Sequence, residues 1–168
     1  MKKESSTIRV KPCKRIVTKD PATKKTNGFL LEVVSERDGF TKHIRGQIYM
    51  TTVEPGAFKG YHLHADADYY VTCIRGQVRE IIYTSAKKKR IIRMGDGDFK
   101  TVFLPRGCPH AIENIGDDVA YILVYRYHAW SPEVHEQMDI ARGDIAKPMI
   151  WKKIRAFLKT FPALDSVQ

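Results

Sequence analysis

The chain has 168 residues, 43% of them hydrophobic, and a formal net charge of +10 at pH 7. This length favours a single domain with a substantial core, and no apolar run is long enough to suggest a membrane span. The basic residues form short scattered clusters without zinc-finger spacing or interleaved aromatic residues, so a solvated surface is the first interpretation, an anionic small ligand the second, and nucleic acid is not expected.

Residues 1–28 are polar and basic, with Pro12, Pro21 and Gly28 as punctuation. They predict a loose arm or an edge strand. The first residues carry charge but no apolar stretch follows them, so we expect no secretory signal.

From residue 29 to about residue 140, the sequence predicts short strands separated by turns rich in Gly, Pro and Asp. The strand-like runs are 29–34, 47–53, 69–74, 77–83, 90–94, 100–104, 110–113 and 119–127. Many short strands at close spacing, without helical periodicity between them, favour an all-β antiparallel sandwich or jelly-roll barrel.

Residues 141–168 form a different segment, in which a helix is predicted near 151–161. Trp151, Ile154, Leu158 and Phe161 recur at helical spacing, and Pro162 ends the pattern. A basic helix of this kind could lie on a membrane surface, but we expect it to pack on the barrel or on a partner subunit.

The candidate site begins with His62 and His64, which alternate along a strand and therefore point to the same face. His110 opens a later strand after a Pro-x-Gly turn and could bring a third imidazole to the same place. Three imidazoles in one pocket indicate a metal site or acid–base chemistry. His43, His128 and His135 have no supporting pattern, and we expect them to be structural or exposed.

Cys13, Cys73 and Cys108 are odd in number and irregularly spaced. This pattern suits free thiols in a reducing cytoplasm better than a disulfide framework. We therefore expect a cytoplasmic protein.

The two histidine-bearing segments resemble the two motifs of the cupins. Residues 56–76 contain the glycine, the paired histidines and the closing glycine of the first motif, and 105–114 carry the Pro, Gly, His and Asn of the second. The resemblance implies a cupin-type jelly-roll barrel over 29–140. Where metal-binding cupins usually have a glutamate after the histidine pair, this chain has Tyr69, with Asp68 one position away.

Residues 45–140 are also similar to cupins that act on nucleotide-linked deoxysugars. Residues 59–62 (Lys-Gly-Tyr-His), 105–111 and 129–133 resemble blocks of the dTDP-4-dehydrorhamnose 3,5-epimerase-like group, and the His-x-His pair is closer to the dTDP-sugar 3,4-ketoisomerases. The resemblance implies a cytoplasmic isomerase or epimerase of a dTDP-type 4-keto-6-deoxy sugar. It would need no metal or other cofactor, would bind a nucleotide-diphosphate sugar and would form a homodimer.

The resemblance implies the base and its carboxylate partner, and the chemistry of the reaction suggests the other catalytic roles. His62 matches the family's base, and Asp139 would be its carboxylate partner, with Asp68 as the alternative. His64 could carry a proton to the neighbouring carbon, which suits ketone migration. Tyr69 or Tyr127 could be the acid if its ring points inward.

Substrate-binding residues follow from the same reaction. Gln47 falls where the family has a substrate-contacting glutamine. Lys59, Arg75 or His110 could stabilise an enolate, and Lys59 and Arg75 could also bind the diphosphate. Tyr127 faces the same pocket in this interpretation, and Tyr49 or Phe58 could stack on the nucleotide base.

Two alternatives remain open at the level of sequence. His62, His64 and His110 could hold iron, zinc or manganese in an oxygenase or a metal-dependent isomerase. The chain could instead be a non-catalytic sugar-binding or regulatory cupin.

Overall fold

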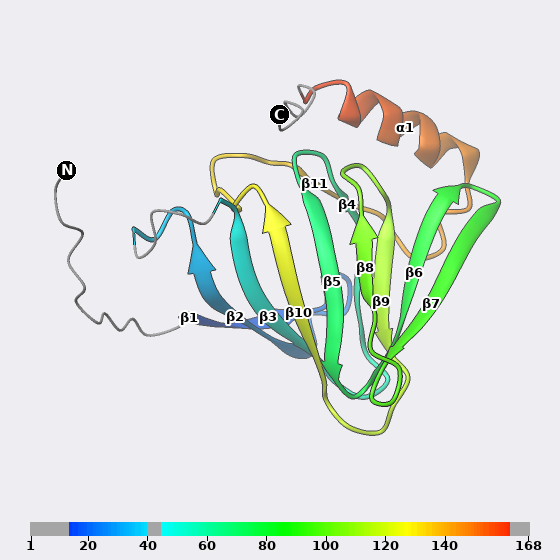
Figure 1. Cartoon of the computed structure of the whole chain (residues 1–168). Helices are drawn as coiled ribbons and strands as arrows, with labels where there is room; N and C mark the ends of the chain where they lie inside the picture. Colours follow the sequence, from blue (N-terminus) through cyan, green and yellow to red (C-terminus); the bar gives the residue numbers. More distant parts are fainter. Residues whose placement is uncertain (1–13, 40–44, 162–168) are drawn as a thin grey trace, which may run out of the picture.

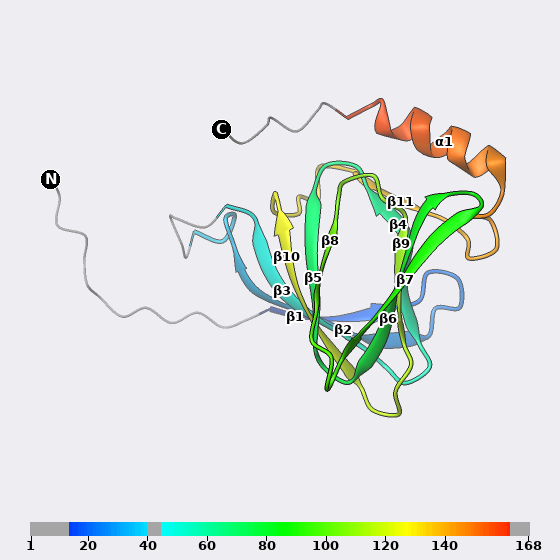
Figure 2. The same ribbon diagram turned by 45° about the vertical axis from the view of Figure 1, so that its right-hand side comes forward.

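The computed structural model describes residues 14–39 and 45–161. The first 13 residues of the expected arm, which include Cys13, lie outside this part. The same holds for His43 and Pro162. Two antiparallel sheets face each other in the described chain, which confirms the predicted all-β class (Figures 1 and 2). Among the described residues, no helix is long and apolar enough to cross a lipid bilayer.

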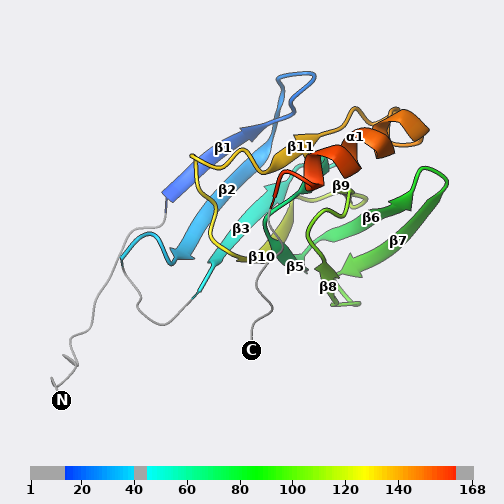
Figure 3. The same ribbon diagram turned by 90° about the horizontal axis from the view of Figure 1, so that it is seen from above.

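The first sheet has six strands in the order β1-β2-β3-β10-β5-β8. Its edge strand β1 and the long β2 form a hairpin that extends the sheet beyond the barrel (Figure 3). Their bounds are β1 Lys14–Lys19, β2 Thr26–Ser35, β3 Gln47–Val53, β10 Ala120–Tyr127, β5 Asp68–Arg75 and β8 Thr101–Leu104.

The second sheet has five strands in the order β11-β4-β9-β6-β7. Their bounds are β11 Gln137–Asp139, β4 Phe58–His64, β9 His110–Asn114, β6 Gln77–Ser85 and β7 Lys88–Gly95. The predicted strand runs lie within about three residues of the observed strands. β4 was anticipated only through its histidine pair, and β11 was not predicted because three residues carry too little periodic signal.

The main core fills the space between the sheets. Inward-facing aliphatic residues alternate along β5 and β10, as expected for strands with one face on the core. They include Val71, Cys73, Ile122 and Val124, each at most 6% exposed.

A second, smaller core lies outside the barrel beneath α1, which spans Pro148–Leu158. The helix therefore begins and ends three residues earlier than predicted, with Pro at its first turn, where its missing N–H costs nothing. Ile154 is 2% exposed and packs with Leu63, Ile140 and Ile145. Figure 1 shows α1 above the strands of the second sheet.

A bulge in β4 sets up the histidine pair. The pairing of β4 with β9 shifts between Gly60 and His62, and Gly60 and Tyr61 have φ values of +101° and +53°. A Cβ at Gly60 would lie 2.7 Å from the Cα atom of Ala111, so only glycine fits this close approach. After the bulge, His62 lies opposite His110.

Candidate functional site

A cavity of about 490 Å³ lies between the two sheets. His62 and His64 of β4 and His110 of β9 line it, together with Tyr69 of β5 and Arg126 of β10. The β1–β2 hairpin contributes further wall residues, including Lys14, Ile16 and Lys19. The structure therefore brings the three histidines to one pocket, as the sequence predicts.

The three imidazoles are close enough to share one ion. One ring nitrogen from each of His62, His64 and His110 lies within 4.8 Å of the others. The ring centroids of His62 and His64 are 4.6 Å apart, and those of His62 and His110 are 5.1 Å apart. A divalent transition metal takes nitrogen ligands at about 2 Å, so small side-chain movements would suffice to close the three nitrogens around it.

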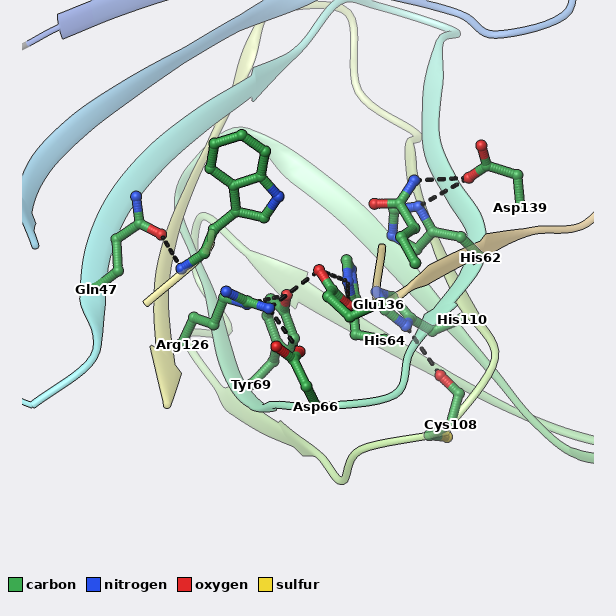
Figure 4. A network of polar contacts seen from close by, with 12 residues as sticks. Gln47, His62, His64, Asp66, Tyr69, Cys108, His110, Arg126, Glu136 and Asp139 are labelled. Carbon is green, nitrogen blue, oxygen red and sulfur yellow. Dashed lines mark hydrogen bonds and ion pairs between the residues drawn. The ribbon is translucent and has the colours of Figure 1, made fainter. Parts of the chain in front are cut away.

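Each imidazole has an oxygen next to its Nδ1 atom (Figure 4). His110 Nδ1 is 3.1 Å from the carbonyl oxygen of Cys108, which can only accept a hydrogen bond, so Nδ1 carries the proton. His64 Nδ1 lies 2.9 Å from Glu136 Oε2, and His62 Nδ1 lies 3.7 Å from Asp139 Oδ1. Nε2 of His64 and of His110 is therefore the nitrogen left to accept a metal ion or a substrate proton.

Burial determines the charge of two of these rings. It lowers the pKa of His64 and of His110 well below the ordinary histidine value, and the neighbouring imidazoles add to the effect. Both rings are therefore neutral at neutral pH. A neutral imidazole with a free lone pair is the form that binds metals.

Arg126 connects the histidines to the opposite sheet. Its Nε atom donates to the hydroxyl of Tyr69 at 2.6 Å, and its Nη2 atom contacts Asp66 at 2.6 Å and Glu136 at 3.0 Å. Glu136 then accepts from His64, so one network joins β10 to β4 (Figure 4). Arg126 is 1% exposed, and its charge is balanced inside the protein.

Tyr69 points into the cavity, as its proposed role as an acid requires. Its ring stacks on His64 with centroids 4.5 Å apart, and burial raises its pKa well above the ordinary value. The hydroxyl is already the acceptor for Arg126. This arrangement favours a role for Tyr69 in fixing the position of His64.

The remaining predicted residues of the cavity are Asp139, Gln47 and Lys59. Asp139 lies opposite His62 across the β4–β11 pair. Gln47 donates to Glu32 at 2.6 Å and accepts from the backbone N–H of Trp130. Lys59 donates to Thr51 Oγ1 at 2.5 Å, and burial lowers its pKa to about 8.

Arg75 and Tyr127 do not line the cavity, so their predicted place in it was wrong. Arg75 is exposed at the far end of β5, six residues or about 20 Å of extended chain from Tyr69. Its guanidinium lies over the ring of Tyr121. Tyr127 follows the inward-facing Arg126 and therefore points to the other face, where its ring packs on His128.

Asp68 does not contact His62 either. Asp68 directly precedes the inward-facing Tyr69 on β5 and therefore points to the opposite face. Its Oδ1 atom accepts a hydrogen bond from the backbone N–H of Arg106 at 2.8 Å. The carboxylate next to His62 is that of Asp139.

Arg126, Glu136 and Asp66 were missed as parts of the site. A signal for Arg126 existed, because it continues the buried alternation of Ile122 and Val124, where a charged residue is unexpected. Glu136 had no comparable signal, because it precedes a strand of only three residues. Glu80, a buried carboxyl group of β6, was also missed, although it too interrupts a buried apolar face of its strand.

Comparisons with known proteins agree with this architecture. A family model described as "Cupin" matches residues 15–139. No curated protein matches the sequence.

Three solved structures illustrate the fold similarity. The capsular polysaccharide assembling protein CapF from Staphylococcus aureus is 18% identical, with a TM-score of 0.63 over 78% of this chain and 32% of that one. A variant of the oxalate decarboxylase of B. subtilis is 20% identical, with a TM-score of 0.57 over 76% and 30%. A cupin-2 domain from Rhodospirillum rubrum is 14% identical, with a TM-score of 0.59 over 92% and 93%. The chain spans about a third of the length of the first two proteins.

Proposed function

This chain belongs to the cupin family, and we propose that it is a cupin enzyme in which His62, His64 and His110 hold a divalent transition metal ion. The observation that carries the proposal is the convergence of three ring nitrogens within 4.8 Å. The oxygens beside the Nδ1 atoms support it, because metal-binding histidines usually donate their other N–H to such groups.

The donor set fits such an ion. Three neutral nitrogen ligands suit zinc, iron or manganese, and Tyr69, in the position of the usual glutamate, is engaged by Arg126. The remaining coordination positions would be open to a substrate. Zinc, iron or manganese at this site would act as a Lewis acid that polarises a substrate carbonyl.

The substrate class that we propose is a nucleotide-linked keto sugar. The sequence resemblance to sugar-nucleotide cupins supports it, and so does the position of Lys14 and Lys19 in the wall formed by the exposed β1–β2 hairpin. The two lysines lie at opposite ends of β1, so either ammonium group could pair with a diphosphate. The cavity of about 490 Å³ is within the usual range for small-molecule sites.

Lys59 is suited to take the proton beside the ketone. With a pKa of about 8, about a tenth of its Nζ atoms are uncharged at pH 7, far more than for an ordinary lysine. Its bond to Thr51 holds Nζ at the cavity wall. This role needs a base whose pKa lies near the working pH, and the pKa of an ordinary surface lysine is too high.

A metal-independent isomerase is the second candidate. It is favoured by the contact between His62 Nδ1 and Asp139 Oδ1, because a carboxylate beside Nδ1 orients the ring and makes Nε2 a better base. In this case His62 itself removes the proton, and the other two imidazoles bind the substrate.

Metal analysis tests the first proposal. Protein reconstituted with zinc, manganese or iron(II) should retain about one ion per chain, and His64→Ala and His110→Ala should lose it. His128→Ala is the matched control, because His128 lies against Tyr127 outside the cavity, and it should retain the ion. A wild-type protein that retains none of the three metals would rule out the proposal.

Solvent exchange separates the two candidates. We expect dTDP-4-keto-6-deoxyglucose, incubated with the enzyme in deuterated water, to gain deuterium beside the ketone, and NMR measures the gain. Exchange that stops after chelation and returns with metal supports the metal-dependent enzyme. Exchange that survives chelation but is lost in His62→Ala supports the second candidate, and no exchange in either form contradicts this substrate class.

A further inference from the structure

Glu80 is a buried carboxyl group for which neither candidate mechanism has a use. It lies on β6 and lines the cavity, yet it is only 1% exposed. Its cross-strand partners are Ile112 on β9 and Ile92 on β7, and Val78 precedes it on the same face. The carboxyl group is therefore surrounded mainly by aliphatic side chains.

The strand register places Glu80 one layer below the histidines. His62, His110 and Ile82 form one row across β4, β9 and β6, and the next row contains Lys59, Ile112 and Glu80. Because β6 lies three strands from β11 in this sheet, Glu80 is on the wall remote from Asp139. A ligand that touches the histidines can extend toward it.

Glu80 has unused hydrogen-bonding capacity within the described chain. Its Oε1 atom is buried and has no partner among the described residues. Burial raises its pKa well above the ordinary value, so the group is a neutral acid at neutral pH. A buried polar group without a partner destabilises the fold, which is the expected arrangement when the partner is a ligand.

We propose that Glu80 anchors the far end of the substrate by a hydrogen bond to an uncharged oxygen, a hydroxyl or a carbonyl. This rests on the proposed function, which places the reacting end of the substrate at the three histidines. An uncharged partner fits because the surrounding aliphatic residues would leave an anionic or cationic ligand group poorly solvated. A sugar hydroxyl meets this requirement.

Matched hydroxamates test the anchor in cobalt-substituted protein. The hydroxamate head binds the metal and changes its visible spectrum, and tails of increasing length end in methyl, hydroxyl or ammonium. At one length, the hydroxyl tail should bind about tenfold more tightly than the methyl tail, the effect of about one hydrogen bond. Glu80→Gln should keep this preference and Glu80→Met should lose it.

The other outcomes of that titration are also decisive. Equal affinity of hydroxyl and methyl tails at every length would overturn the anchor, and so would a preference for the ammonium tail. If no hydroxamate changes the cobalt spectrum, the proposed metal site fails, and the anchor is then judged by stability alone.

Stability gives that independent measure, without any metal. A carboxyl group reserved for a ligand should make the ligand-free protein less stable than Glu80→Met, so the variant should have a higher Tm. A lower Tm for Glu80→Met would mean that Glu80 supports the fold itself, and the anchor would be wrong.

Discussion

Arg126 shows how one residue organises the candidate site. Its guanidinium contacts Tyr69, Asp66 and Glu136, and Glu136 in turn contacts His64. Arg126 and Glu136 are each 1% exposed. In such surroundings a charge is tolerated only with its partners in place, so the network has little freedom to rearrange.

Replacing Arg126 should therefore be costly. We expect Arg126→Met to lower the free energy of unfolding by about 3–5 kcal/mol, because Glu136 would be left as a buried carboxylate without its cation. Urea denaturation measures the loss. Arg142→Met is the control: its side chain is 59% exposed beside Glu113, and a loss below about 1 kcal/mol is expected. Equal losses would contradict the role given to Arg126.

At the scale of elements, β4 determines where the histidines lie. The bulge at Gly60 and Tyr61 brings His62 opposite His110, while Leu63, between the two histidines, faces the second core beneath α1. The turn before His110 is also fixed from outside, because a Cβ at Gly107 would lie 2.8 Å from Leu158 Cδ1 of the helix. The helix thus supports both histidine-bearing segments.

Gly60→Ala tests the bulge. The added methyl group would lie 2.7 Å from Ala111 Cα and 2.8 Å from the carbonyl oxygen of His110, so β4 must move away from β9. We expect metal affinity to fall at least tenfold and stability to fall by about 1–3 kcal/mol. Gly56→Ala is the control, because φ is also positive at Gly56 but no atom lies within 4 Å of the added Cβ. We expect this variant to show a similar backbone strain and to retain its metal affinity. Metal titration of both variants tests this. Equal losses of affinity would mean that the bulge does not position the histidines.

At the scale of the whole molecule, the chain builds two cores. The barrel core includes Val71 and Ile122, and the outer cluster of Leu63, Ile140, Ile145 and Ile154 holds α1 against the back of β4. The cavity lies on the other face of β4, so the outer cluster supports the wall that carries the histidines without contributing to the lining.

Ile154→Ala should weaken this support. We expect a loss of about 2–4 kcal/mol in the free energy of unfolding, from the lost burial and the cavity that remains. Met149→Ala on the same helix is the control, since Met149 is 62% exposed and its loss should stay within about 0.5 kcal/mol. Thermal and urea unfolding measure both variants. Equal stability of the two would contradict a structural role for α1.

The sequence by itself determined the features that depend on local geometry. Alternation along a strand put His62 and His64 on one face, and the Pro-x-Gly turn placed His110 at the start of its strand. The strands of the barrel followed from the same short-range pattern, because the backbone repeats every two residues whatever surrounds it. Asp139 came from the family resemblance.

Only the tertiary structure decided which groups meet across the barrel. Pairing of β11 with β4 put Asp139 opposite His62, and packing of the two sheets brought Arg126 to Glu136. It also left Arg75 and Tyr127 outside the cavity and Glu80 inside it. Such contacts depend on strand order, register and the separation of the sheets, which are set by the packing of the whole core rather than by any local run of residues.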